Sequence, residues 1–230
     1  LTSGAAPIDF YRDVKGTIAF RNNDLELASK TFKSIDRNFW KNAYSYTDYL
    51  DENPFIPKAL TYKDKRNYNY DFNKVRFIDE ILRLKDDDTP ENLLKLGHAY
   101  YNVSFFGNSW MMVSYGISSY EDTDATSFYY YMADTAKRKK NFQNGNYYGC
   151  TMAKEYYKKV LENAKSNKEQ KAMALLMIHI CNENVFSFNK VYDSKETYKA
   201  GKELYEFYSD YSDTKIFKRY SCPLLESYVK

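Results

Sequence analysis

Apolar residues recur at steps of three and four over residues 9–36, which predicts two consecutive helices. The expected packed face of the first helix comprises Ile8, Tyr11, Val14, Ile18 and Ala19. The expected packed face of the second helix comprises Leu25, Ala28, Phe32 and Ile35. Between the two, "RNND" interrupts the pattern, and Asn23 or Asp24 suits the N-cap of the second helix. We therefore predict a helical hairpin.

The small residues of this hairpin have a regular spacing. Gly16 is followed three residues later by Ala19 and twelve residues later by Ala28, and Phe32 and Ile35 come four and seven residues after Ala28. This spacing resembles the tetratricopeptide (TPR) repeat, in which small residues allow two antiparallel helices to cross closely. The resemblance covers one unit of about 34 residues, roughly 9–42.

The same spacing occurs again further along the chain. Gly97 is followed twelve residues later by Ser109, and Val113 and Gly116 come four and seven residues after Ser109. We therefore expect a second hairpin, with Thr89 as N-cap and Pro90 at the first helical position of its first helix. The second helix of this hairpin is expected to open at Trp110, after a turn at Gly107 and Asn108.

A weaker third recurrence lies at residues 146–165, where Ala153, Tyr157 and Val160 show the small-large-large steps of a second repeat helix. Further helices are predicted at about 72–84, 167–184 and 194–209, with a short capping helix within 212–223 that stops near Pro223. The fold class expected is all-α, a TPR-like superhelix of helical hairpins with irregular insertions.

The expected organisation has three parts. Residues 1–50 form the first hairpin and a following helix, residues 51–71 an irregular connection, and residues 72–230 further repeats with a C-terminal cap, all within one helical domain. Pro54 and Pro57 break the helix before the connection. The connection and a second irregular patch at 117–127 are where family-specific function is expected.

Composition excludes several classes of function. The net charge is +3 with both signs interspersed, so no nucleic-acid partner is expected. The low counts of glycine (8) and proline (5) argue against a β-sandwich. The 25 tyrosines suit half-buried helix faces, and they leave open a glycan- or small-molecule-binding surface that uses exposed tyrosines and Trp110.

Catalytic and metal-binding motifs are absent from the sequence. His98 and His179 lie on predicted helices away from any known motif. Cys150, Cys181 and Cys222 lack zinc-site spacing; Cys181 and Cys222 suit a disulfide in an oxidising compartment, but burial as reduced thiols is the favoured interpretation. We therefore expect no enzyme activity, cofactor or metal, with an enzyme site in the inserted loops as the weaker alternative.

Two charged stretches have competing interpretations. The "KRKK" stretch at 137–140 suits phosphate or acidic lipid headgroups, although basic residues at the end of a helix also complement its dipole. Asp122 and Asp124 suggest a cation loop, but the stretch lacks the glycine and the distal glutamate of an EF-hand, which favours a solvated loop.

The ordered set "YLDENPFIPKAL", "NKVRFIDEILRLK", "YYNVSFFGNSW", "YYGCTMAKEYYKKVLENA" and "DTKIFKRYSC" resembles the C-terminal region of an uncharacterised family of TPR-containing lipoproteins from Bacteroidota. The resemblance implies an exported, membrane-tethered protein with further repeats upstream. Because the chain opens "LTSGAAPIDF" without an initiating Met, we expect it to be part of something longer, with any lipid anchor outside it.

The repeat register also assigns the residues of a concave face. In the first unit they are Phe10, Asp13, Thr17, Phe20 and Arg21, and in the second Glu91, Leu94, His98, Tyr101 and Asn102. From these we select Phe20, Arg21, His98, Tyr101 and Asn102 as candidate partner-binding residues. The function expected is a non-enzymatic scaffold in the cell envelope that binds a protein or peptide.

Overall fold

The computed structural model describes residues 7–42, 53–57, 73–115, 143–189 and 199–230. Over these ranges the regular secondary structure consists of helices, without a strand, which confirms the all-α prediction. In order, the α-helices are α1 (Ile8–Arg21), α2 (Leu25–Lys33), α3 (Arg37–Asn42), α5 (Lys74–Lys85), α6 (Pro90–Asn102), α9 (Thr151–Glu162), α10 (Lys168–Asn189), α11 (Lys202–Asp210), α12 (Lys215–Tyr220) and α13 (Pro223–Ser227).

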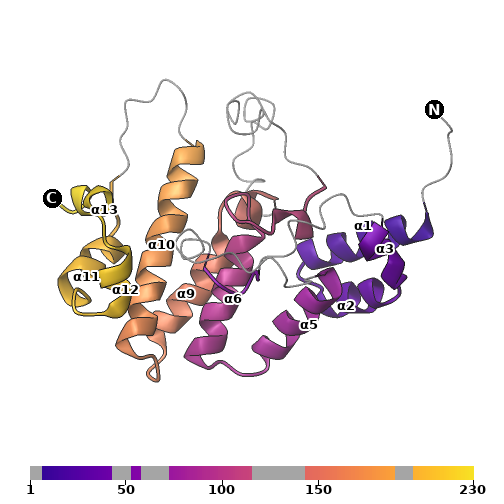
Figure 1. Ribbon diagram of the computed structural model, residues 1–230, viewed down its shortest axis with the longest axis horizontal. Coiled ribbons are helices and arrows are strands. Elements are labelled where there is room, and N and C mark those ends of the chain that lie inside the picture. Colours follow the sequence, from indigo (N-terminus) through magenta and orange to yellow (C-terminus); the bar gives the residue numbers. More distant parts are fainter. Residues whose placement is uncertain (1–6, 43–52, 58–72, 116–142, 190–198) are drawn as a thin grey trace.

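The longer helices form a linear array (Figure 1). Each packs against the next one along the chain: α1 on α2, α2 on α5, α5 on α6, α6 on α9, α9 on α10, and α10 on α11. The array therefore runs from the indigo end at α1 to the yellow end at α11–α13. One apolar cluster of buried side chains extends along it from α1 to α10, and a second joins α10 to α11.

Side-chain caps explain where several helices begin. The side chains of Asp24, Asn73, Thr89 and Thr214 each accept a hydrogen bond from the backbone N–H three residues later. These bonds satisfy donors that have no partner inside the helix. Asp24, rather than Asn23, is therefore the cap of α2, and the predicted cap at Thr89 is confirmed.

Two hairpins have the same close crossing. A Cβ atom added to Gly16 of α1 would lie 2.5 Å from Cε1 of Phe32 on α2, and one added to Gly97 of α6 would lie 2.5 Å from Cε1 of Tyr157 on α9. In both cases an aromatic ring rests directly on the glycine. The hairpin α1–α2 is the one predicted, whereas α6 pairs with a helix that the sequence register did not assign to it.

The predicted partner of α6 was wrong. Residues Trp110–Met112 form a single 3₁₀ turn, η2, rather than the start of a long helix, and Gly116 lies outside the described residues. The partner is α9, where Ala153, Tyr157 and Val160 occupy the small-large-large positions and are buried. Residues 103–150 are thus inserted between the two helices of one hairpin.

The packed face of α1 also differs from the prediction. Ile8, Tyr11 and Ile18 are 63%, 55% and 51% exposed, whereas Ala19 is buried as expected. The buried side of the helix instead includes the polar residues Asp13 and Thr17, together with Gly16 and Phe20. The apolar stripe that was expected to be core therefore faces outward.

Other predicted boundaries are closer to the structure. The helix expected at 72–84 is α5, and the one expected at 167–184 is α10, which continues to Asn189. Only the second part of the helix expected at 194–209 lies among the described residues, as α11. The predicted short capping helix is α12, which ends at Tyr220 shortly before Pro223, and Pro223 begins a further helix, α13.

Substitution of Gly97 by Ala is expected to lower the free energy of unfolding by about 1–3 kcal/mol, because the new methyl group collides with the Tyr157 ring in a filled core. Gly16→Ala should behave similarly against Phe32. The measurement is urea denaturation followed by circular dichroism. At an open helix position the same change would stabilise by about 1 kcal/mol, so unchanged or increased stability would contradict the close crossing.

Candidate functional site

The five predicted partner-binding residues do not form one open surface. Phe20, His98, Tyr101 and Asn102 are each at most 5% exposed, and Arg21 is half-buried. They lie on α1 and α6, and each contacts a different part of the chain. In the described structure four of them are core residues, so their proposed role in binding a partner stays a prediction without an accessible surface to support it.

Phe20 and Arg21 join the end of α1 to its neighbours. The Phe20 ring lies nearly parallel to that of Tyr100 on α6, with centroids 6.1 Å apart, and meets Phe77 of α5 edge-on at 5.7 Å. The Arg21 guanidinium donates to the backbone carbonyl of Val113. Burial lowers the pKa of Arg21 from its usual value. Both residues therefore hold α1 against the rest of the array.

His98 is a neutral core residue. Its Nδ1 lies 2.8 Å from the Tyr157 hydroxyl on α9, so the two share a hydrogen bond beside the Gly97 crossing. Burial lowers the pKa of His98 to about 3. The ring is therefore uncharged near neutral pH and contributes to the hairpin rather than to an acid–base site.

Tyr101 and Asn102 complete the buried end of α6. The Tyr101 hydroxyl accepts a hydrogen bond of 3.0 Å from the Asn184 amide on α10. The Asn102 amide donates to the carbonyls of Pro54 and Ile56, at 2.8 and 2.7 Å. Asn102 thus anchors the proline-broken segment 53–57 on α6.

A buried charge cluster lies between α1 and α5. Lys74 Nζ donates to Asp13 Oδ1 at 2.8 Å and to Thr17 Oγ1 at 2.9 Å, and both charged side chains are at most 1% exposed. The Tyr115 hydroxyl donates to Asp13 Oδ2 at 2.9 Å, and its ring lies 4.9 Å from Lys74 Nζ. This cluster was not predicted, because Asp13 and Thr17 were assigned to an open concave face.

Burial affects the pKa of Lys74 more strongly than the neighbouring carboxylate of Asp13 does. Desolvation lowers its pKa to about 8, although Asp13 acts in the opposite direction. Between pH 8 and 10.5 the unfolded chain would bind a proton that the folded chain has lost, so the Lys74 contribution to stability rises with pH in this window. Since the ammonium group is enclosed, the cluster fixes α1 on α5, and we assign it a structural role.

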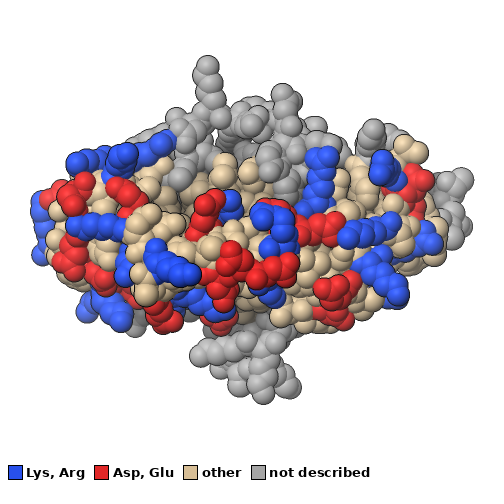
Figure 2. Space-filling model, turned by 90° about the horizontal axis from the view of Figure 1, so that it is seen from below, with Lys and Arg blue, Asp and Glu red and all other residues tan. Residues whose placement is uncertain are grey.

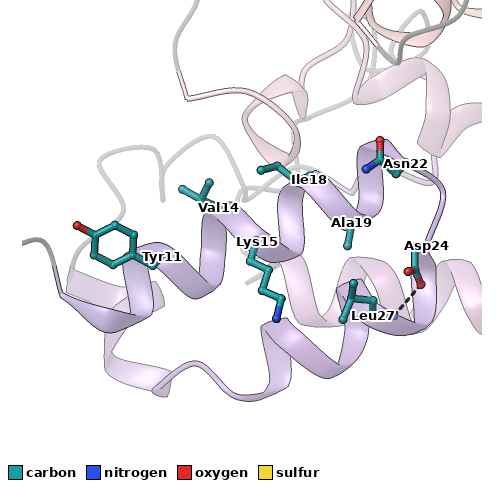
Figure 3. Close-up of a pocket in the computed structure, with 8 residues that line it drawn as sticks. All are labelled: Tyr11, Val14, Lys15, Ile18, Ala19, Asn22, Asp24 and Leu27. Atoms are coloured by element: carbon teal, nitrogen blue, oxygen red, sulfur yellow. Dashed lines mark hydrogen bonds between the residues drawn. The ribbon is translucent and has the colours of Figure 1, made fainter.

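An open groove lies on the outer side of α1 and α2 (Figure 3). It has a volume of about 310 Å³ and is lined by Tyr11, Val14, Lys15, Ile18, Ala19, Asn22, Asp24 and Leu27. We call it the α1–α2 groove. Its apolar side chains include Tyr11, Ile18 and Leu27, which are 55%, 51% and 37% exposed. Three of its residues, Tyr11, Val14 and Ile18, belong to the apolar periodicity of α1. The sequence therefore marked these residues, but the periodicity predicted them to be part of the core.

Lys15 is the cation of this groove. It is exposed and forms no ion pair with a carboxylate among the described residues. Nearby cations are paired: Arg12 with Asp9 at 2.8 Å, and Lys33 with Asp79 of α5 at 2.8 Å. The α1–α2 groove therefore combines exposed apolar side chains with an exposed cation.

Charges of both signs alternate on the surface as they do along the sequence. On the face shown in Figure 2, basic and acidic side chains are interspersed among the other residues. The basic stretch at 137–140 and the acidic patch within 117–127 lie outside the described residues.

The remaining candidate chemistry gives no second site. All three cysteines are free: Cys150 and Cys181 are buried, as the favoured interpretation expected, whereas Cys222 is exposed, contrary to that interpretation. Among the described residues, no group of three or more histidine, cysteine, aspartate or glutamate side chains is placed to hold a metal ion. Trp110 is half-buried and packs against the core, and a glycan surface built on it stays a prediction.

Comparison with protein-family models, with curated proteins and with solved structures found no match. Within the described residues, no helix combines the length and apolar character needed to cross a membrane. The site assignments therefore rest on the geometry of this chain alone.

Replacement of Lys74 by Met is expected to destabilise the fold by roughly 3–5 kcal/mol, because it leaves the Asp13 carboxylate buried without its partner. Lys33→Met is the matched control, since its bridge to Asp79 is largely exposed and should contribute less than about 1 kcal/mol. Replacing Lys74 by Met and Asp13 by Leu together should recover much of the loss. Equal effects of the two single lysine changes in urea denaturation would contradict a structural charge cluster.

His98 is expected to make the fold sensitive to acid. Between pH 6.5 and 3 the unfolded chain protonates His98 and the folded chain does not, so acidification lowers the free energy of unfolding by about 1.4 kcal/mol per pH unit from this group. His98→Gln removes the titration and retains a hydrogen-bonding side chain beside Tyr157. Urea denaturation at pH 6.5, 5.5 and 4.5 should show a shallower acid dependence for the variant; parallel curves would contradict the depressed pKa.

Proposed function

We propose that the chain is a non-enzymatic helical-repeat scaffold that binds a protein partner through the α1–α2 groove. The observation that carries this proposal is an apolar stripe of α1, including Tyr11 and Ile18, that is exposed beside Leu27 of α2. Contiguous exposed apolar side chains with polar groups at the rim mark interaction surfaces more often than incidental exposure does.

The TPR-like character of the array is supported by its two equivalent hairpins. Gly16 against Phe32 and Gly97 against Tyr157 place an aromatic ring at the same distance from the small residue of the first helix. Repeat arrays of this kind use extended surfaces to bind peptides and helices. The same geometry supports a scaffold in preference to an enzyme, because the buried polar groups of the array serve helix packing.

The groove suits a protein better than a small polar ligand. Its lining is mainly aliphatic and aromatic, and its polar side chains, Lys15, Asn22 and Asp24, lie among or beside these apolar residues. Asp24 is already engaged as the N-cap of α2, where its carboxylate accepts from Leu27 N at 3.1 Å. An apolar side chain of a partner would gain about 25 cal/mol for each Å² removed from water here.

We further propose a location in the cell envelope, either periplasmic or tethered to the outer membrane. The support is the resemblance to TPR-containing lipoproteins of Bacteroidota. Membrane association would then require a lipid anchor outside this chain, and the membrane would not be a binding partner of the array itself.

The test is a comparison of proteins captured from an extract of the source organism. The double variant Ile18→Glu and Leu27→Glu is expected to lose the partner, because burial of each apolar side chain contributes about 1.5–3 kcal/mol to binding. Leu224→Glu on α13 is the matched control, since this exposed leucine lies at the other end of the array. With the purified partner, the groove variant should bind at least tenfold more weakly.

Unfolding curves of both variants verify that the fold is retained, since each substituted side chain is exposed. A set of captured proteins that does not differ between the wild type and the groove variant would contradict binding at the α1–α2 groove.

A further inference from the structure

Two of the three cysteines lie together in the core. Cys150 immediately precedes α9, and Cys181 lies on α10, which packs against α9 (Figure 1). Both residues belong to the same apolar cluster and are at most 1% exposed. Their thiol groups form a hydrogen bond with each other. Two sulfur atoms from different helices are therefore in contact inside the array.

The backbone holds Cys150 in an uncommon conformation. Its φ of 50° and ψ of 28° lie in the left-handed region, which residues other than glycine seldom adopt. Its N–H donates to the carbonyl of Asn146 at 3.2 Å, and its carbonyl accepts from Lys154 N at 3.0 Å. Its Sγ lies 3.7 Å from Ser104 Oγ. These contacts fix the residue on both sides and keep its thiol beside Cys181.

The two thiols differ in acidity. The hydrogen bond from Cys181 has the largest effect on Cys150 and lowers the pKa of its thiol, and Ser104 and Lys154 act in the same direction. Burial raises the pKa of the Cys181 thiol well above its usual value, and the bond to Cys150 raises it further. Cys150 therefore ionises first, while Cys181 keeps its proton. A thiolate in contact with a second thiol is the arrangement from which a disulfide closes.

Cys222 is a poorer partner for Cys181. Cys222 is exposed and precedes α13, whereas Cys181 is fully buried and its thiol is engaged with Cys150. A disulfide requires the sulfur atoms to approach to about 2.05 Å, and thiols that are already in contact need the least movement to do so. The structure thus favours a bond between Cys150 and Cys181, where the sequence had left open one between Cys181 and Cys222.

We infer that Cys150 and Cys181 form a disulfide in an oxidising compartment and thereby join α9 to α10. The oxidant is a disulfide, RSSR. The Cys150 thiolate attacks one sulfur of RSSR, so the S–S bond of RSSR breaks and RS⁻ leaves with the electron pair. RS⁻ takes the proton of Cys181, whose sulfur then attacks Cys150 Sγ and releases the second RS⁻. Two cysteine sulfurs are oxidised, and RSSR is reduced to two thiols.

Burial determines when this bond forms. Since both thiols are enclosed, RSSR reaches them while α9 and α10 are still separating or coming together, and the bond closes as the helices pack. The inference does not depend on the α1–α2 groove. It agrees with the periplasmic location proposed above, because disulfides persist in that compartment.

The experiment maps the disulfide in the full chain. The reduced chain is refolded from urea in reduced and oxidised glutathione, free thiols are alkylated, and the product is digested with trypsin. The three cysteines fall in separate tryptic peptides, residues 141–154, 172–190 and 220–230, so mass spectrometry identifies each linkage. The linkage of 141–154 to 172–190 should exceed each linkage to 220–230 by about tenfold or more, because contact in the folded chain raises the effective concentration of this pair.

Cys222→Ser is the matched control. This variant should form the same linkage, and its urea midpoint should be higher than when it is refolded with a reductant alone, because the crosslink constrains the unfolded chain. Cys150→Ser and Cys181→Ser should abolish both the linkage and the effect of the reductant. If either of these variants does not fold, the peptide maps of the wild type and of Cys222→Ser still decide. Reduced Cys150 and Cys181 after refolding, a predominant linkage of Cys181 to Cys222, or a midpoint lowered by oxidation would overturn the inference.

Discussion

The close crossing of paired helices at a glycine is the constraint on which the array depends. At Gly16 and at Gly97 the ring of Phe32 or Tyr157 occupies the space where a side chain would lie. The ring contacts the backbone of the opposite helix directly, so the separation of the helices is set by atoms that have little freedom to adjust. Once this separation is fixed, His98 can reach the Tyr157 hydroxyl, and the faces available to the next helices are determined.

A buried charge cluster then decides which face of α1 is inside. Asp13 and Thr17 face Lys74, and Tyr115 lies over the same cluster, so α1 is held with its polar side toward α5. The apolar stripe that contains Ile18 must then face away from α5. The groove is thus a consequence of an ion pair on the other side of the helix. The desolvation that lowers the pKa of Lys74 to about 8 indicates that enclosing this pair opposes folding, so apolar packing elsewhere must hold it in place.

Much of the helical framework was predictable because it is local. The caps at Asp24 and Thr89, the first hairpin and the extent of α5 follow from residues within one or two turns. The pairing of α6 with α9 was not predictable in this way. The entropic cost of closing a loop grows only slowly with its length, so residues 103–150 can be inserted between the two helices while the crossing is kept. Periodicity also failed for α1, which carries apolar residues on two sides. It cannot show that Asp13 has a buried cation 61 residues away.

The α1–α2 groove was not predicted because periodicity does not show what packs against a helix face. A stripe such as Tyr11, Val14 and Ile18 has the same pattern whether it packs against its own chain or against another protein, because both cases remove apolar area from water. What distinguishes them is the presence of a covering helix, and that depends on the whole array. On α1 no described helix covers the stripe, and Ile18 is 51% exposed. A large apolar side chain at the exposed position supports the proposal that a protein partner covers this surface.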